Sequence, residues 1–215
     1  MSKIFLIPGL GADARIYQYI DLPGHETIPV KWLEPDKQDT LSTYAQKLID
    51  HYSITPQSIV IGNSLGGMLT IEIAKKVDLD KAILISSIKT VTEAPRSFKW
   101  YRLLPFYKLI PSKWLTYTGF MVRKVMGKMS KHHQELFVSM LKGTSPAFVK
   151  WALGAIPQWD NQIIPPNVYH ITGDRDKIFS YKRIKGATIV EGGTHIMIFN
   201  KAKQINSWLK EILQN

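Results

Sequence analysis

The chain has 215 residues, of which 45% are hydrophobic and 21% charged, and it contains no Cys. This composition is typical of a globular protein and argues against a disordered or collagen-like chain. The lack of Cys excludes disulfides, thiolate metal sites and a cysteine nucleophile. No run of eighteen uncharged apolar residues is present, and the apolar start at Ile4–Ile7 is too short for a signal peptide. We therefore expect a soluble, cytoplasmic protein with one domain, or with one domain and an insertion.

The formal net charge of +11 is concentrated in one segment. Residues 96–150 contain eleven Lys or Arg and a single acid, Glu135, so this segment alone carries +10. A basic surface of this kind is typical of proteins that bind nucleic acid or anionic membranes. The segment has no recognisable nucleic-acid motif, so we expect no nucleic-acid partner. Three interpretations stay open: an anionic substrate, a weak contact with an anionic membrane surface, and solubility alone.

Short apolar runs followed by turns recur along the chain and predict the strands of a sheet. They lie at Lys3–Ile7, Ser58–Ile61, Lys81–Ile85, Val168–Thr172 and Ala187–Val190. Because these runs are apolar throughout and do not alternate, we expect strands that are buried on both faces, as in a parallel sheet. A weaker candidate, Glu26–Leu33, contains Pro29. Proline cannot donate to the ladder, which predicts an edge strand.

Helical patterns lie between these runs. The spacing of apolar residues predicts helices over Thr40–Tyr52, Leu65–Val77 and Asn200–Leu213, the last with Asn200 as its N-cap. Alternating strands and helices are typical of βαβ units with right-handed crossovers. The predicted fold class is therefore α/β, with a mostly parallel sheet and helices on both of its faces.

The alternation stops over residues 88–161, which predict a helical insertion between two strands. Its clearest helix begins with Ser145 as N-cap and Pro146 in the first turn, and runs to Ile156. We therefore expect a core domain formed by residues 1–87 and 162–215, with 88–161 as a helical cap.

The motif that carries chemistry is Gly62-Asn63-Ser64-Leu65-Gly66, which follows a predicted strand and opens a predicted helix. A Ser on such a turn is held in a strained backbone conformation, which side chains at positions 62 and 66 would obstruct. The start of the helix offers the N–H of Leu65 to a negative charge that develops on a substrate oxygen. We therefore predict that Ser64 is a nucleophile.

A serine nucleophile needs a base, and six His are available. We favour His195, because it follows a predicted strand and a glycine turn, at the end of the sheet where such loops gather. His170 lies inside a strand pattern and is interpreted as a packed core residue. The His132-His133 pair, with Glu135, raises the alternative of a metal site. Adjacent side chains on a helix diverge, so we prefer a solvent-exposed face there.

Two acids follow the strand that precedes His195. Asp174 comes immediately after Gly173 and can cap the turn, whereas Asp176 reaches farther toward a histidine on the next loop. We favour Asp176 as the residue that orients His195, with Asp174 as the alternative.

The chain order Ser64, Asp176, His195, each after a separate strand, resembles the α/β-hydrolase family. The segment Ile171–Asp176 is similar to that family's turn with the catalytic acid, and Phe5–Gly11 is similar to its oxyanion turn. The resemblance implies that the N–H of Leu10 joins that of Leu65 as an oxyanion donor. It also implies that the insertion is the family's cap, and that the sheet begins at the family's third strand and keeps six strands. No metal and no organic cofactor is implied.

Two features depart from the family pattern. Pro8 stands where a His commonly precedes the oxyanion glycine. Only eighteen residues separate Asp176 from His195, which leaves little room for the helix that the family usually has there.

These residues predict acyl transfer to water, with Ser64 attacking a carbonyl, His195 carrying the proton and Asp176 orienting the imidazole. The resemblance implies a small serine esterase that acts on a small-molecule acyl substrate through an acyl-enzyme, with a thioesterase as the second choice. A Ser nucleophile argues against the family's dehalogenases and epoxide hydrolases. The alternatives are a ligand-binding homologue with slow or no turnover, and a peripheral lipid hydrolase at an anionic membrane.

The predicted cap contains apolar side chains that can roof an acyl pocket, although each of them can also simply pack the cap onto the sheet. They are Trp100, Phe106, Trp114, Phe120, Phe137, Met140 and Trp151.

Overall fold

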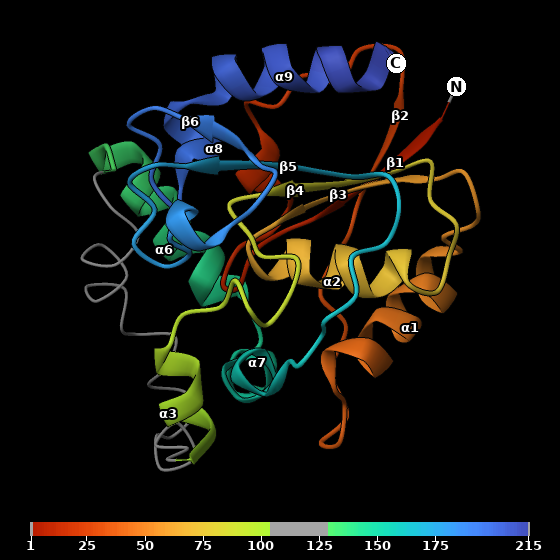
Figure 1. The fold of residues 1–215 in the computed structure, drawn as a ribbon, viewed down its shortest axis with the longest axis vertical. Helices are drawn as coiled ribbons and strands as arrows, with labels where there is room; N and C mark the ends of the chain where they lie inside the picture. Colours follow the sequence, from red (N-terminus) through yellow and green to blue (C-terminus); the bar gives the residue numbers. More distant parts are fainter. Residues whose placement is uncertain (1, 104–128, 215) are drawn as a thin grey trace.

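The computed structural model describes residues 2–103 and 129–214, and its centre is a six-stranded sheet (Figure 1). Neighbouring strands all run parallel, in the order β2-β1-β3-β4-β5-β6. The strands are β1 Lys3–Ile7, β2 Glu26–Pro29, β3 Ile59–Asn63, β4 Lys81–Ile85, β5 Val168–Gly173 and β6 Thr188–Val190. The predicted α/β class is confirmed. The strand with Pro29 lies at an edge, as its missing N–H requires, and is shorter than the predicted run Glu26–Leu33.

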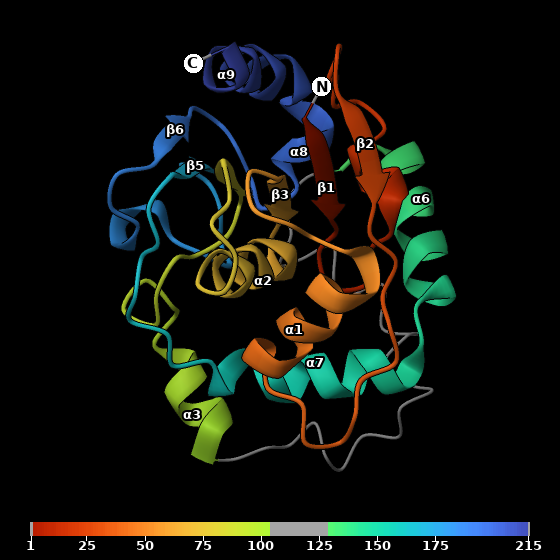
Figure 2. The same cartoon turned by 90° about the vertical axis from the view of Figure 1, so that its right-hand side faces the viewer.

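Helices cover both faces of the sheet (Figures 1 and 2). On one face lie α1 (Leu41–Tyr52) and α2 (Leu65–Ala74), and on the other lie α8 (Met197–Asn200) and α9 (Ala202–Gln214). Side chains alternate along β1, so Phe5 and Ile7 pack in the cluster with α1 and α2, whereas Ile4 and Leu6 pack in the cluster with α9. Burial on both faces explains why the strands are apolar throughout.

Two predicted helix ends were wrong. Helix α2 stops at Ala74, because the N–H groups of Lys76 and Val77 both bond to the carbonyl of Ile73 and form a tight turn. Asn200 is not the N-cap of the last helix; it ends α8. The backbone turns at Lys201, with φ −122° and ψ 21°, and α9 begins after it. The apolar residues before Lys201 form a separate short helix that is buried, so the apolar pattern continues across the turn.

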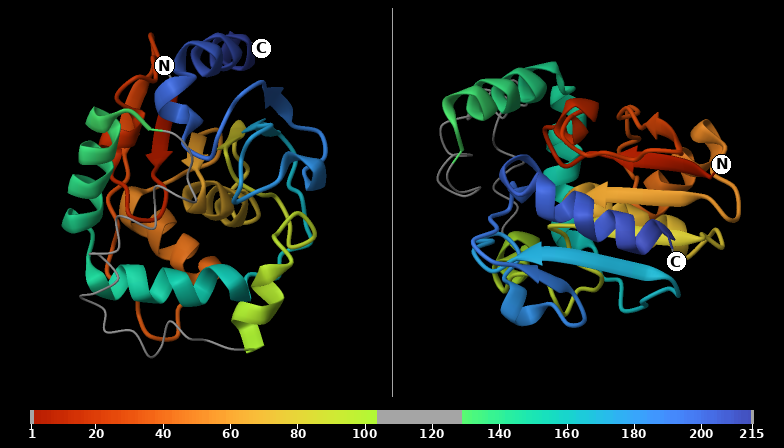
Figure 3. Two further views of the ribbon diagram at one scale, coloured as in Figure 1. Left: turned by 90° about the vertical axis from the view of Figure 1, so that its left-hand side faces the viewer. Right: turned by 90° about the horizontal axis from the view of Figure 1, so that it is seen from above.

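Three described helices lie between β4 and β5, beyond the carboxyl ends of the strands (Figure 3). They are α3 Ser97–Leu103, α6 Lys131–Gly143 and α7 Pro146–Gln158. Helix α7 begins as predicted, because the side chain of Ser145 accepts the N–H of Phe148, and it continues two residues past the predicted end. The domain boundaries at 88 and 161 stay a prediction.

The described residues also form two short 3₁₀ helices, η1 Ala14–Tyr17 and η3 Tyr181–Arg183. Between Asp176 and His195 the chain forms η3 and β6 and no α-helix. This matches the short spacing of those two residues in the sequence.

Candidate active site

Ser64 stands on a sharp turn between β3 and α2, where its motif predicts it. Its backbone angles, φ 53° and ψ −116°, are rare for a residue with a side chain. A Cβ on Gly62 would collide with the backbone of Gly66, and a Cβ on Gly66 would collide with the carbonyl oxygen of Ile7. The two glycines therefore let the turn fold tightly and pack against the end of β1.

Ser64 belongs to a chain of hydrogen bonds with residues from two other loops. The Nε2 atom of His195 lies 2.9 Å from Ser64 Oγ, and its Nδ1 atom lies 2.8 Å from Asp176 Oδ2. The side chains of His195 and Asp176 are 3% and 0% exposed, whereas Ser64 is half-buried. The structure thus brings together the three residues that the sequence singled out, each from the loop after a different strand.

The carboxylate of Asp176 is held on both of its oxygens. Its Oδ1 atom accepts the backbone N–H groups of Ile178 at 2.8 Å and Phe179 at 2.9 Å, which fixes the plane of the carboxylate. The backbone N–H of Asp174, the alternative acid, bonds to the carbonyl of Val190 at 3.2 Å. In the described part of the chain, no hydrogen bond joins Asp174 to His195.

The loop after β1 lies directly beside Ser64. A Cβ on Gly9 would lie 3.3 Å from Ser64 Cβ and 3.1 Å from Asn63 Oδ1, which is a tight fit, so the loop passes close to the serine. Leu10 follows on this loop, and Leu65 is the first residue of α2, where a backbone N–H has no partner inside the helix. The two N–H groups that the sequence nominates as oxyanion donors therefore lie on segments that flank Ser64.

Ser64 and His195 open into a cavity of about 310 Å³. Apart from these two residues and Asn63, its described lining is apolar, and none of the described lining residues is Lys, Arg, Asp or Glu. Helix α7 contributes Val149, Leu153 and Ile156, which follow one another at helical spacing on one side of the helix. The cavity therefore suits an uncharged apolar group next to the serine.

The apolar cap residues named from the sequence have different positions. Phe137 lines the cavity, and Met140 is fully buried beside it without lining it. Trp151 lines a different cavity, and Trp100 is 68% exposed. Phe106, Trp114 and Phe120 lie outside the described residues. Sequence reasoning did not identify the rest of the cavity wall, which includes Leu141, Val149, Leu153, Ile156, Ile178 and Phe179. The helical spacing of the apolar residues within α7 could have indicated part of it.

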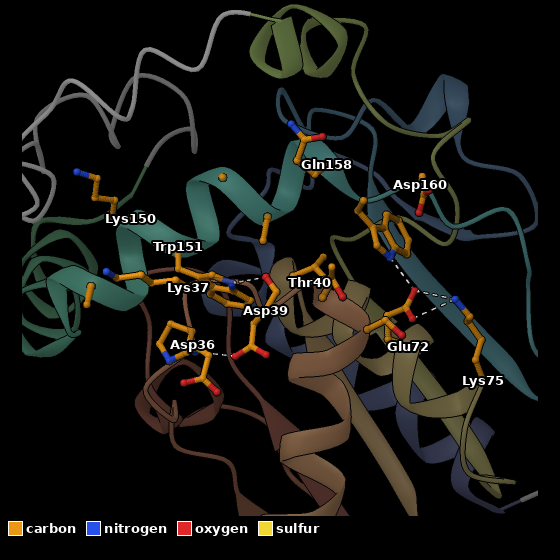
Figure 4. Close-up of a pocket in the computed structure, with 17 residues that line it drawn as sticks. Asp36, Lys37, Asp39, Thr40, Glu72, Lys75, Lys150, Trp151, Gln158 and Asp160 are labelled. Carbon is orange, nitrogen blue, oxygen red and sulfur yellow. Dashed lines mark hydrogen bonds and ion pairs between the residues drawn. The ribbon is translucent and has the colours of Figure 1, made fainter.

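A larger groove of about 920 Å³ lies on the other side of α7 (Figure 4). There the indole of Trp151 donates to the carbonyl of Asp39 at 2.8 Å, and the indole of Trp159 donates to Glu72 at 2.8 Å. Glu72 also pairs with Lys75 at 2.9 Å. This groove contains none of the three residues of the hydrogen-bonded chain, so we place the candidate active site in the smaller cavity.

His170 is buried in β5, as its position in a strand pattern predicts. Burial, and to a lesser extent the ammonium of Lys89, lower the pKa of His170 to about 3. The Nζ atom of Lys89 lies 3.2 Å from His170 Nδ1 and 2.9 Å from Glu93. A lysine can only donate, so this contact requires a neutral imidazole.

Of the His132-His133 pair, His133 packs among aromatic side chains. His133 stacks on Phe199 with the ring centres 4.8 Å apart, and its Nε2 atom lies 3.3 Å from the hydroxyl of Tyr19. In residues 2–103 and 129–214, no cluster of three or more His, Asp or Glu is arranged to hold a metal ion.

Six of the eleven cations in the basic segment lie in the described residues, on or next to α3, α6 and α7. Arg102 is tied to the end of α7, because its guanidinium donates to the carbonyls of Pro157 and Trp159. None of the described helices is long and apolar enough to cross a membrane. The proposed contacts of the basic segment with an anionic substrate or a membrane surface stay predictions.

Comparisons with known proteins bear on the fold and the family. The sequence profile of the alpha/beta hydrolase family matches residues 4–207. No curated protein matches the chain in sequence. An esterase from Exiguobacterium antarcticum is similar in structure with a TM-score of 0.75 and 14% identity, over 100% of this chain and 92% of the other. A hydrolase from Pseudomonas aeruginosa PA01 has a TM-score of 0.77 and 15% identity, over 100% of this chain and 90% of the other. A bromoperoxidase from Bacillus anthracis has a TM-score of 0.70 and 16% identity, over 100% of this chain and 92% of the other. At these identities the similarity concerns the fold alone.

Proposed function

Because the chain belongs to the alpha/beta hydrolase family, we propose that it is a serine hydrolase that cleaves a carboxylic ester through an acyl-enzyme intermediate. The observation that carries the proposal is the hydrogen-bonded chain from Asp176 through His195 to Ser64, next to an apolar cavity. A serine hydroxyl is a weak nucleophile by itself, and a base at hydrogen-bond distance is what activates it.

In the first step, Ser64 Oγ attacks the ester carbonyl and His195 Nε2 takes the hydroxyl proton. Asp176 accepts the hydrogen bond from Nδ1–H, which keeps the imidazole in the tautomer that can receive a proton at Nε2, and it stabilises the imidazolium that forms. His195 then gives its proton to the departing alcohol oxygen, and the acyl group remains on Ser64. Water repeats the sequence and releases the carboxylic acid.

The negative charge of the tetrahedral intermediate would be stabilised by the backbone N–H groups of Leu10 and Leu65. Both belong to rigidly packed backbone beside Ser64, where donors need little reorganisation during the reaction. The loss of one such donor costs about 3–4 kcal/mol of transition-state stabilisation in other hydrolases.

The acyl part of the substrate would occupy the cavity below α7. Its described apolar lining favours an uncharged hydrocarbon acyl group over one with a terminal charge. An alkyl ester and an acyl thioester present the same acyl group, so the choice between them depends on the leaving group.

A fluorophosphonate probe tests the proposal directly, because it labels an activated serine covalently. We expect one equivalent of label on the wild type and on Ser139→Ala, which changes an exposed serine of α6, and none on Ser64→Ala. The same three proteins are then assayed with p-nitrophenyl esters and with thioesters of the same acyl groups. A folded wild type that takes no label and hydrolyses neither class would contradict the proposal and favour a ligand-binding homologue.

A further inference from the structure

Tyr17, the last residue of η1, directs its hydroxyl to the carboxyl-terminal end of β1 and the adjacent part of β3. Its oxygen lies 2.7 Å from the carbonyl oxygen of Ile7 and 3.1 Å from that of Ile61, so one O–H donates to both β1 and β3. Ile7 and Gly62 form the last pair of the β1–β3 ladder. The tyrosine is 4% exposed, so water does not compete for these bonds.

The hydroxyl keeps its proton at all ordinary pH values. Burial raises the pKa of Tyr17 well above its usual range, although a hydrogen bond with the backbone of Asn63 opposes this shift. The hydroxyl therefore remains a donor for the two carbonyls at these pH values.

Both segments that diverge from this junction lead to the candidate oxyanion donors. The chain after Ile7 reaches Leu10 within three residues, and the chain after Ile61 reaches Leu65 within four. The carbonyl of Ile7 is enclosed on its other side by Gly66, where a Cβ would collide with it. The carbonyl of Ile7 thus lies between the hydroxyl of Tyr17 and the start of α2. These contacts fix the distance between the segment that follows Ile7 and the segment that follows Ile61.

We propose that Tyr17 is a positioning residue, whose hydroxyl holds the N–H groups of Leu10 and Leu65 at the separation that an oxyanion requires. This inference rests on the proposed function. Such donors act only when they are aimed at the position of the developing charge, and a displacement of about 1 Å can cost about a hundredfold in rate. Tyr17 is not itself among the described residues that line the cavity, and its hydroxyl bonds to backbone carbonyls, so it acts through the backbone.

Tyr17→Phe, with Tyr44→Phe as its matched control, tests the inference. Tyr44 is also fully buried, and its hydroxyl also bonds to backbone, to the N–H and the carbonyl of Leu33 at 2.9 Å. In Tyr17→Phe we expect kcat for a p-nitrophenyl ester to fall about ten- to a hundredfold, with KM within about twofold. An alkyl boronic acid, which forms a tetrahedral adduct with an active serine, should lose affinity by the same factor. In Tyr44→Phe both quantities should stay within about twofold of the wild type, although unfolding becomes easier.

Three outcomes would overturn the inference. If the wild type is active, unchanged kcat and boronic acid affinity in Tyr17→Phe would refute the inference about Tyr17 and leave the proposed function intact. Equal losses in Tyr17→Phe and Tyr44→Phe would do the same. A wild type without hydrolysis or labelling would refute the proposed function and this inference with it. If Tyr17→Phe does not fold, 3-fluorotyrosine at position 17 keeps the ring and a hydroxyl of altered acidity. We then expect kcat and boronic acid affinity to shift together, and no shift in either would refute the inference.

Discussion

The backbones of Gly173 and Gly193 are in direct contact: a Cβ on Gly193 would lie 2.8 Å from the Cα of Gly173, and a Cβ on Gly173 would collide with the carbonyl of Gly193. Gly173 is the last residue of β5, directly before the loop with Asp176, and Gly193 precedes His195 by two residues. This contact therefore sets how far the loop of the acid lies from the loop of the base.

Gly173→Ala should separate these two loops. Because the added methyl group meets backbone and not a flexible side chain, the loops themselves must move, and we expect kcat/KM to fall by about tenfold or more and stability by about 1–3 kcal/mol. Gly143→Ala is the control, because a Cβ there meets nothing within 4 Å. It should leave kcat/KM unchanged and raise helix stability slightly. Steady-state kinetics and urea unfolding of both variants check this, and unchanged kinetics in Gly173→Ala would contradict it.

Asp176→Asn and Asp174→Asn should differ strongly in activity. In Asp176→Asn the amide oxygen would keep accepting the N–H groups of Ile178 and Phe179, so the amide NH2 would face His195 Nδ1 and favour the wrong tautomer. We therefore expect kcat to fall about ten-thousandfold. Asp174→Asn should keep kcat within about twofold, because the described hydrogen bond of His195 Nδ1 goes to Asp176 and Asp174 Oδ1 has no partner among the described residues. Single-turnover assays measure both effects. A large loss in Asp174→Asn with an active Asp176→Asn would reverse the assignment of the acid.

Leu153→Trp should shorten the preferred acyl chain. Leu153 lines the cavity from α7, so a larger side chain there occupies space that a long acyl group needs. We expect kcat/KM for dodecanoyl esters to fall about tenfold or more, with butanoyl esters little affected. Gln158→Trp places the same side chain on the groove side of α7 and should leave the chain-length profile unchanged (Figure 4). If kcat/KM depended on acyl chain length in the same way in both variants, α7 would not form the wall of the acyl site.

His170 should make the fold sensitive to acid. Its pKa is 6.5 in an unfolded chain and about 3 in the folded protein, so between these values the unfolded state binds more protons. The stabilisation is therefore fully present above pH 6.5 and is lost as the pH falls toward 3. At pH 5 the loss amounts to about 2 kcal/mol.

Urea unfolding at pH 7.5 and pH 5 measures this loss. His170→Gln should show a smaller decrease in the free energy of unfolding than the wild type, because it has no imidazole to protonate there. His51→Gln, on the exposed face of α1, should decrease as the wild type does. Equal decreases in all three proteins would exclude His170 as the source.

The fold was predictable because the strands are short and apolar throughout. The run Lys81–Ile85, for example, coincides with β4 from end to end. The positions of Ser64 and its glycines also followed from sequence, since few backbone geometries need Gly at both 62 and 66. Asn200 shows the opposite case, because a change of helix direction leaves the apolar pattern intact.

The cavity wall was harder to predict than the positions of Ser64, Asp176 and His195. Trp151 and Leu153 are two residues apart on α7, and both are large and apolar. Whether a helix turns one or the other toward the serine depends on how it packs, and here Trp151 bonds to Asp39 and its ring centre lies 4.5 Å from that of Tyr44. Apolar composition alone does not determine that rotation.

The edge strand β2 has a consequence for how copies of this protein behave at high concentration. The N–H of Val30 bonds to Leu6 in β1, so the nitrogen of Pro29, one residue earlier, faces away from the sheet. A further strand that docked there would find no donor at that position, and the opposite edge, β6, is three residues long. Both borders of the sheet therefore resist edge-to-edge pairing between molecules, and the protein should tolerate crowding without forming intermolecular β-structure.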